Sequence, residues 1–214
     1  MAEYRTIDYR CPYCGHTFPV NMYDVIDADS EPDLKDRCRS GDLFHVSCPH
    51  CRKEYMIQYP LLYLDRSRRF GILLSEREAA PFVHGVGPAL VKEGYRLRRC
   101  TSLQSFTEKI TIFEDDADDV MVELAKYDTF IEYTDNRKGT PEDISSIEYQ
   151  RTENDVMKIN VRADDKSMSF LIPVSMMKEE MEQEAELYKI PDEDFPVIDS
   201  AWVISLFTPE DGKA

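Results

Sequence analysis

Two short cysteine motifs constrain the fold of this chain more than any other feature of its sequence. Cys11 and Cys14 form the first pair, Cys48 and Cys51 form the second, and in each pair a proline and one further residue separate the cysteines. Two intervening residues let one tight turn direct both sulfurs at a single ion, and the second pair completes a four-sulfur shell. A closed shell of four thiolates leaves no position for water or substrate. The motifs therefore predict one structural Zn²⁺ site.

The same spacing also occurs in thiol–disulfide oxidoreductases of the thioredoxin superfamily. In those enzymes the first cysteine lies at a helix N-terminus, which lowers its pKa, so a helix must follow the motif. Gly15 and Pro19 follow the first pair and oppose a helix. After the second pair, Tyr55, Ile57 and Tyr59 alternate with other residues as in a strand. This pattern favours a zinc ribbon, with a redox pair as the alternative.

Composition favours a folded protein that stays in the cytoplasm. The chain has 214 residues, 42% of them apolar, which is enough for a substantial core. No apolar run reaches the roughly 18–20 residues of a membrane span. The first residues also lack the apolar stretch of an export signal. We therefore expect a cytoplasmic location, no membrane partner, and six cysteines that remain thiols or metal ligands.

Acidic residues are concentrated in the second half of the chain. Residues 1–100 contain 15 Lys/Arg and 14 Asp/Glu, whereas residues 101–214 contain 11 and 28, for a net charge of −16. This balance opposes non-specific binding to nucleic acids. Some arginines are expected to pair with carboxylates at 114–123 or 179–186, with a nucleic-acid contact as the alternative. The arginines concerned are Arg66, Arg68, Arg69, Arg96, Arg98 and Arg99.

Apolar periodicity predicts mainly strands in the first hundred residues. A helix is expected at 31–39, capped by Ser30 and ended by Gly41. Gly85, Gly87 and Pro88 are expected to break regular structure. The predicted strands cover residues 3–10, 17–25, 42–47, 53–59, 70–75 and 95–101.

The remainder of the chain combines helices and strands. Apolar stripes predict helices around 103–113, with Ser102 as cap, and 120–131. The acidic run 115–119 is expected to cap the second helix rather than to bind a cation. Strands are predicted at 144–152, 157–161, 168–172 and 201–207, and an acidic helix at 177–188. Met176, Met177 and Met181 favour core packing, with a peptide groove as the alternative.

These elements predict an α+β fold. It comprises a zinc-ribbon-like β module with mixed strands and a central helical segment, followed by a smaller α+β part at the C-terminus. A stretch of Gly, Pro and charged residues from 136 to 143 suggests the division. We expect one domain at 1–133 and an acidic subdomain at 140–214.

With these elements placed, residues 8–132 resemble the CpXC family. The similarity is carried by the two cysteine motifs, the acidic segment 29–36, Gly41 ahead of Phe44, the segment 59–65, and the segments 96–98, 108–110 and 118–119. A weaker likeness lies near 197–202. The resemblance implies a bacterial or archaeal source and zinc binding, and it implies no particular reaction. One departure is Cys38, where the family favours an aliphatic residue.

The other cysteines and histidines form no recognisable catalytic set. Cys38 and Cys100 have no partner at two-residue spacing and are expected to be buried apolar side chains. His16 and His50 lie beside predicted ligands and are expected to contact sulfur rather than the ion. His45 and His84 lack the nearby pattern of a catalytic triad.

The sequence thus predicts a zinc-stabilised, non-enzymatic interaction or regulatory protein with a protein partner. Zinc ribbons often serve as rigid platforms, and no phosphate loop or nucleophile motif competes with this interpretation. A nucleic-acid-associated ribbon and a thiol–disulfide oxidoreductase are the alternatives.

Overall fold

The computed structural model describes residues 4–77, 83, 85–135, 139–153, 155–164 and 166–208. The chain divides into two compact units, one formed by residues 1–110 and 193–196, the other by residues 111–192 and 197–214. Both units combine helices with β-sheets, which confirms the predicted α+β class. Every described helix is too short or too polar to cross a lipid bilayer. The sequence-based domains, 1–133 and 140–214, stay a prediction.

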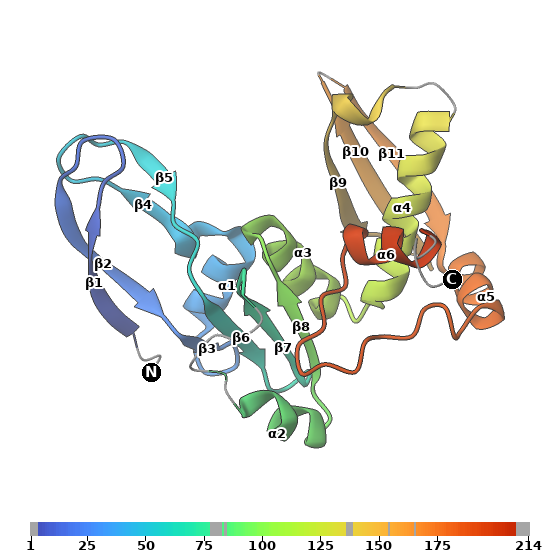
Figure 1. Ribbon diagram of the computed structural model, residues 1–214, viewed down its shortest axis with the longest axis horizontal. Coiled ribbons are helices and arrows are strands. Elements are labelled where there is room, and N and C mark those ends of the chain that lie inside the picture. The colour runs from blue at the N-terminus through green and yellow to red at the C-terminus, as the bar shows by residue number, and fades with distance from the viewer. Residues whose placement is uncertain are drawn as a thin grey trace, which may run out of the picture. The chain divides into compact units, whose positions relative to one another are not determined.

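The first unit contains two hairpins, a four-stranded sheet and short helices (Figure 1). The hairpins are β1–β2 and β4–β5, and the sheet has the order β3-β6-β7-β8. The elements are β1 (Tyr4–Arg10), β2 (Thr17–Tyr23), β3 (Val25–Asp27), α1 (Pro32–Ser40), η1 (Asp42–Phe44), β4 (His45–Ser47), β5 (Glu54–Met56), β6 (Leu61–Asp65), β7 (Phe70–Leu74), α2 (Val86–Lys92) and β8 (Arg96–Cys100). Helix α3 (Leu103–Glu114) contributes residues to both units.

The four-stranded sheet supplies the core of the first unit. Its central strands β6 and β7 are buried at every position, and they pair antiparallel while each also pairs parallel with an outer strand. Parallel pairing requires long connections, and these contain α1 between β3 and β6 and α2 between β7 and β8. Aromatic rings of Phe44, Tyr63 and Phe106 pack edge to face in this core. Strand β6 was not predictable from alternation, because a strand buried on both faces lacks it.

Helix α1 begins and ends close to the predicted residues, but its cap is different. Glu31 occupies the N-cap position without a side-chain hydrogen bond, and Pro32 begins the helix. The Ser30 hydroxyl instead donates to the carbonyl of Asp27, so the predicted Ser30 cap is wrong. Gly41 ends the helix with a left-handed φ of 81°, as expected for a glycine after a helix.

Residues 86–92 form helix α2, so the prediction that this segment lacks regular structure is wrong. Gly87 and Pro88 lie in its first turn, where a missing backbone N–H costs nothing. A Cβ at Gly87 would lie 2.7 Å from Cβ of Asp194, so only glycine fits against the segment 193–196. Phe195 of that segment packs into the apolar cluster containing Leu73. This packing explains why four residues from late in the sequence belong to the first unit.

The second unit is a three-stranded antiparallel sheet with helix α4 on one face (Figure 1). The sheet order is β11-β10-β9. Tyr133 of α4 packs against Val161 and Ala163 of the central strand. The elements are α4 (Asp119–Asp135), η3 (Pro141–Asp143), β9 (Ile144–Arg151), β10 (Val156–Ala163), β11 (Lys166–Pro173), α5 (Val174–Gln183) and α6 (Ser200–Phe207). The three predicted strands and their hairpin are confirmed.

Two predictions near the C-terminus are wrong. Residues 200–207 form helix α6 rather than a strand, because the Asp199 side chain caps the helix by accepting a 2.9 Å hydrogen bond from the backbone N–H of Trp202. Helix α5 ends at Gln183 rather than near residue 188. Tyr188 still packs beside it, and its hydroxyl lies 3.4 Å from a carboxylate oxygen of Glu180.

Candidate metal centre

Each cysteine pair lies in a tight turn between two antiparallel strands. We call residues 11–15 the first knuckle and residues 48–52 the second knuckle. In the first knuckle the Cys11 N–H donates to the carbonyl of His16 (2.9 Å), and the Gly15 N–H donates to the carbonyl of Cys11 (2.9 Å). The second knuckle repeats both bonds, from Cys48 to Lys53 (3.0 Å) and from Arg52 to Cys48 (2.9 Å). The two turns are thus structural repeats.

The repeats bring four sulfurs together, and the two turns meet at the ends of their hairpins (Figure 1). All four Sγ atoms lie within 4.8 Å of one another. The Sγ atoms of Cys11 and Cys51 are 3.8 Å apart, and those of Cys14 and Cys48 are 3.7 Å apart. Four sulfurs bound about 2.3 Å from a tetrahedral ion lie about 3.8 Å from one another. The cluster therefore has the dimensions of a four-thiolate metal site, and it could hold a metal ion.

The protonation of the thiols also reflects this crowding. Burial acts against the Cys11 thiolate, but backbone N–H groups of Cys14 and Tyr13 and the neighbouring thiols lower the pKa of Cys11 to about 6. At Cys14 a backbone hydrogen bond from His16 favours the thiolate, yet burial and the other three cysteines raise its pKa to about 12. The four cysteines thus favour one thiolate, at Cys11, and oppose ionisation of Cys14. A bound cation would reverse this opposition.

The sulfurs are partly shielded by a small aromatic cluster. Cys11 and Cys48 are buried, Cys51 is half-buried and Cys14 is exposed. The buried sulfurs pack with Phe18, and partly buried side chains surround them, among them Tyr9, Val20, Val46 and Tyr55. Burial and the neighbouring Cys11 raise the pKa of the Tyr55 phenol, which therefore stays protonated. Tyr55 was not predicted as part of this site, although its position four residues after Cys51 on a strand indicates it.

The predicted redox alternative lacks its structural requirement. Strand β2 follows the first knuckle and strand β5 follows the second. Neither pair therefore has the following helix whose N-terminus would activate a thiol for attack. All six cysteines are free.

The remaining cysteines, and the histidines that the structure describes, do not belong to the four-cysteine cluster. Cys38 on α1 and Cys100 on β8 are buried, and burial raises the pKa of Cys38 to about 12, so its thiol is unreactive. The exposed rings of His16 and His50 stack on each other, with centroids 5.2 Å apart. His45 is exposed on β4. His84 lies outside the described residues.

The acidic run 115–119 serves the helix, as predicted. A carboxylate oxygen of Asp118 accepts hydrogen bonds from the backbone N–H groups of Val120 (2.9 Å) and Met121 (3.3 Å) at the start of α4. Asp115 pairs with Arg151 on β9. Within the described part of the chain, the four cysteines are the one group of three or more His, Cys, Asp or Glu side chains close enough together to hold a metal ion.

Arg66 and Arg68 each pair with a carboxylate of the first unit. Arg66 pairs with Asp27 on β3 at 2.6 Å, and Arg68 pairs with the fully buried Asp65 at 3.0 Å. Both carboxylates lie near the ends of neighbouring sheet strands, so these arginines stabilise the first unit itself. The expected pairing of some of the six arginines with carboxylates at 114–123 or 179–186 stays a prediction.

Comparison with known families supports the metal interpretation. A family model described as CpXC protein matches residues 9–126, more than half of the chain. The match includes both knuckles and the whole four-stranded sheet. No curated protein and no solved structure matches the chain.

Proposed function

The chain belongs to the CpXC family, and from that premise we propose that it is a zinc-stabilised, non-enzymatic interaction or regulatory protein. In this proposal Cys11, Cys14, Cys48 and Cys51 bind one Zn²⁺ as thiolates. The spacing of the four sulfurs is the observation that carries it: all lie within 4.8 Å of one another, and two of their separations, 3.7 and 3.8 Å, match tetrahedral thiolate coordination. Zinc is favoured over other ions because four soft thiolates in a closed shell are typical of structural zinc sites.

A structural role for the ion is supported by the small size of the surrounding core. Three buried residues form the centre of the knuckle cluster, namely Cys11, Phe18 and Cys48, and two of them are metal ligands. Such a cluster cannot by itself offset the conformational entropy of two ordered hairpins. The ion would supply the missing free energy and make the two hairpins a rigid platform.

The proposal includes a cytoplasmic location and a protein partner. Six free cysteines suit a reducing compartment, and the strong negative charge does not suit a nucleic-acid backbone. A closed thiolate shell offers no open coordination position to a substrate, which supports a non-enzymatic role.

Native mass spectrometry of the purified chain tests the metal directly. We expect one zinc per chain, and its loss in Cys14→Ser and in Cys51→Ser. The matched control is Cys38→Ala, which removes a buried cysteine outside the cluster and should retain the metal. A metal-free chain, or one in which Cys38→Ala loses the ion as readily, would refute the proposal.

One observation favours a nucleic-acid-associated ribbon as the second candidate. Tyr13 in the first knuckle is 56% exposed, and the Lys53 ammonium lies 4.5 Å from its ring centroid. An exposed ring beside a cation is suited to stacking on an unpaired base. Fluorescence anisotropy with labelled single-stranded RNA and DNA tests this role. Binding that weakens with salt and is lost in Tyr13→Ala would favour the second candidate over the first.

A further inference from the structure

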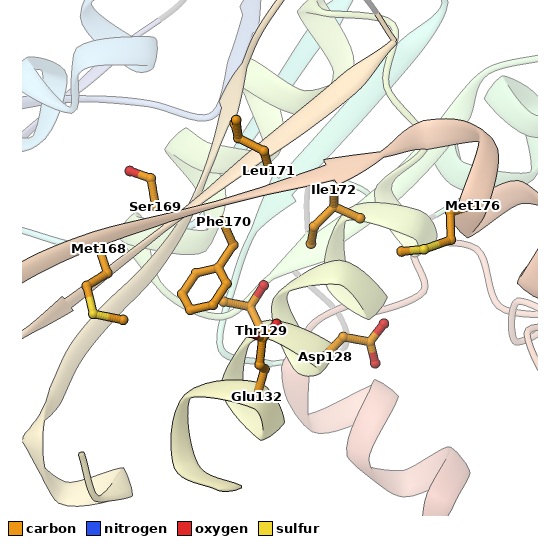
Figure 2. A pocket seen from close by; sticks show the side chains of 9 residues that line it. All are labelled: Asp128, Thr129, Glu132, Met168, Ser169, Phe170, Leu171, Ile172 and Met176. Atoms are coloured by element: carbon orange, nitrogen blue, oxygen red, sulfur yellow. The ribbon is translucent and has the colours of Figure 1, made fainter. Parts of the chain in front are cut away.

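A groove runs along the edge of the sheet in the second unit. It encloses about 760 Å³ between strand β11 and helices α4 and α5. Figure 2 shows Met168, Phe170 and Ile172 pointing from β11 toward α4, while Ser169 and Leu171 point away from it. The residues that line the groove are Asp128, Thr129, Glu132, Met168, Ser169, Phe170, Leu171, Ile172 and Met176. A groove of this size suits a ligand that covers several side chains.

Strand β11 forms an edge of the sheet, with β10 as its neighbour in the strand order. Edge strands are usually protected from pairing by charged residues or proline within the strand. Lys166 and Pro173 stand at the two ends of β11, but the six residues between them, 167–172, are all uncharged. The opposite edge strand β9 carries Glu148 and Arg151. Of the two edges, β11 is therefore the one better suited to pair with an additional strand.

Apolar surface accompanies this edge. Leu171 is 67% exposed and Met176 is 53% exposed, and both line the groove. Phe170 and Ile172 on the inner face are half-buried. Met177, the neighbour of Met176, is fully buried, so of the two methionines one packs in the core and the other faces the groove. The arrangement supplies apolar contacts for alternate side chains of an added strand.

Carboxylates on the helical wall give the groove a charge preference. Asp128 and Glu132 of α4 line it, and Glu180 of α5 acts electrostatically on Asp128. Burial and this neighbouring carboxylate raise the pKa of Asp128 to about 6. A positive side chain would relieve the repulsion. A second copy of this chain would instead bring two acidic walls toward each other, on a protein of net charge −16.

We propose that the β11 groove binds an extended basic segment of a partner protein by strand addition. The segment would pair with the outer edge of β11, place apolar side chains at alternate positions against Phe170, Ile172 and Met176, and direct a lysine or arginine at Asp128. This inference rests on the interaction role proposed above, but it uses no residue of the four-cysteine cluster. Failure of zinc binding and failure of peptide binding are therefore separate results.

The first experiment pans a phage-displayed library of seven-residue peptides on the full zinc-loaded chain. We expect enriched peptides with apolar residues at alternate positions and at least one lysine or arginine. A synthetic, labelled copy of the most enriched peptide then serves as the probe. Hydrogen–deuterium exchange with and without the probe should show new protection of residues 166–173. Enrichment of acidic or patternless peptides, or protection confined to another segment, would overturn the proposal.

Substitutions test the edge and the charge separately. Leu171→Lys places a charge within the edge strand, and Asp128→Lys reverses the charge of the wall, and each should weaken probe binding about tenfold or more. The matched controls are Ile204→Lys, at a residue 48% exposed on α6, and Glu142→Lys, at an exposed residue of η3. Both controls should bind the probe like the unmodified chain. Equal affinities in all four variants would refute the site.

A second copy of the chain is the competing occupant. Sedimentation equilibrium measures the oligomeric state of the unmodified chain and of Leu171→Lys. A monomer in both cases agrees with the proposal. A dimer that Leu171→Lys dissociates would show that the edge pairs with itself and would overturn the proposed partner.

Discussion

Gly15 and Arg52 are equivalent residues of the two knuckles. Each follows the second cysteine of its pair and donates its backbone N–H to the carbonyl of the first cysteine. Both have a left-handed backbone, with φ of 74° at Gly15 and 61° at Arg52. Glycine adopts this conformation without strain, whereas a residue with a Cβ pays a cost of about 1–2 kcal/mol. The second knuckle therefore holds strain that the first avoids.

The first prediction concerns substitutions that remove the left-handed strain at Arg52 and introduce it at Gly15. Arg52→Gly should stabilise the zinc-loaded chain by about 1 kcal/mol, because it removes the left-handed strain. Gly15→Ala should destabilise it by about 1 kcal/mol, although a Cβ there would meet only the Arg10 side chain at 3.5 Å, an ordinary contact. Denaturant unfolding of both variants measures the two free energies. The same sign of change in both would contradict the equivalence of the knuckles.

The second prediction concerns removal of the metal. Chelation should unfold the hairpins β1–β2 and β4–β5, since their cluster is centred on two ligand cysteines, and structural zinc contributes on the order of 10 kcal/mol. The β3-β6-β7-β8 sheet has its own apolar core, centred on residues such as Tyr63 and Phe70, and should stay folded. Hydrogen–deuterium exchange before and after chelation measures both regions. Unchanged protection at residues 8–23 and 45–56 would show that no structural ion is bound there.

The sequence predicted the four-cysteine cluster because the spacing of the cysteines within each pair is a local property. Cys11 and Cys14 are positioned by one turn, and Cys48 and Cys51 by a turn with the same hydrogen bonds. The long helices α3 and α4 were also predictable from their apolar stripes. Their caps at Ser102 and Asp118 follow from the same local rule, and both accept the expected backbone hydrogen bonds.

Features that depend on distant residues were not predictable in the same way. Helix α6 is an exception whose local signal was missed: residues 201–207 are apolar enough for a buried strand, and the adjacent cap at Asp199 distinguishes the helix. Gly87 and Pro88 indicated a break, but Gly87 serves close packing against Asp194, more than a hundred residues later. The groove along β11 depends on which strand lies at the edge of the sheet, which a single sequence does not specify.

The third prediction compares a buried carboxylate that forms ion pairs with a carboxylate in an exposed ion pair. Asp65 is fully buried and pairs with Arg68 at 3.0 Å and with Lys35 at 3.7 Å. Asp65→Ala should cost about 2 kcal/mol, because the buried carboxylate accepts hydrogen bonds from the Ser67 hydroxyl, the Arg68 backbone N–H and the Arg68 guanidinium, and all three are lost. The matched control is Asp24→Ala, which breaks the exposed pair with Arg5 and should cost less than about 1 kcal/mol. Thermal and denaturant unfolding measure both; equal costs would contradict a structural role for Asp65.

The fourth prediction concerns pH and Asp128. Its pKa is raised from 3.8 to about 6 by burial and by Glu180, so the folded chain holds this proton more tightly than the unfolded chain. The protonated carboxyl is therefore the favoured form in the fold. The stability that it contributes is present below pH 3.8 and is lost as the pH rises toward 6 and above. Asp128→Asn cannot ionise and does not lose this contribution.

Asp128→Asn should therefore be more stable than the unmodified chain at pH 8, by about 1 kcal/mol once its partial exposure to solvent is allowed for. The difference should shrink toward zero at pH 4, where the unmodified carboxyl is mostly protonated. Urea unfolding of both chains at the two pH values measures it, and Glu142→Gln at an exposed position is the matched control. The control should show no such trend. A difference between Asp128→Asn and the unmodified chain that is equal at pH 4 and pH 8 would mean that burial of the Asp128 charge does not oppose folding, and that the acidic wall of the groove is already compensated.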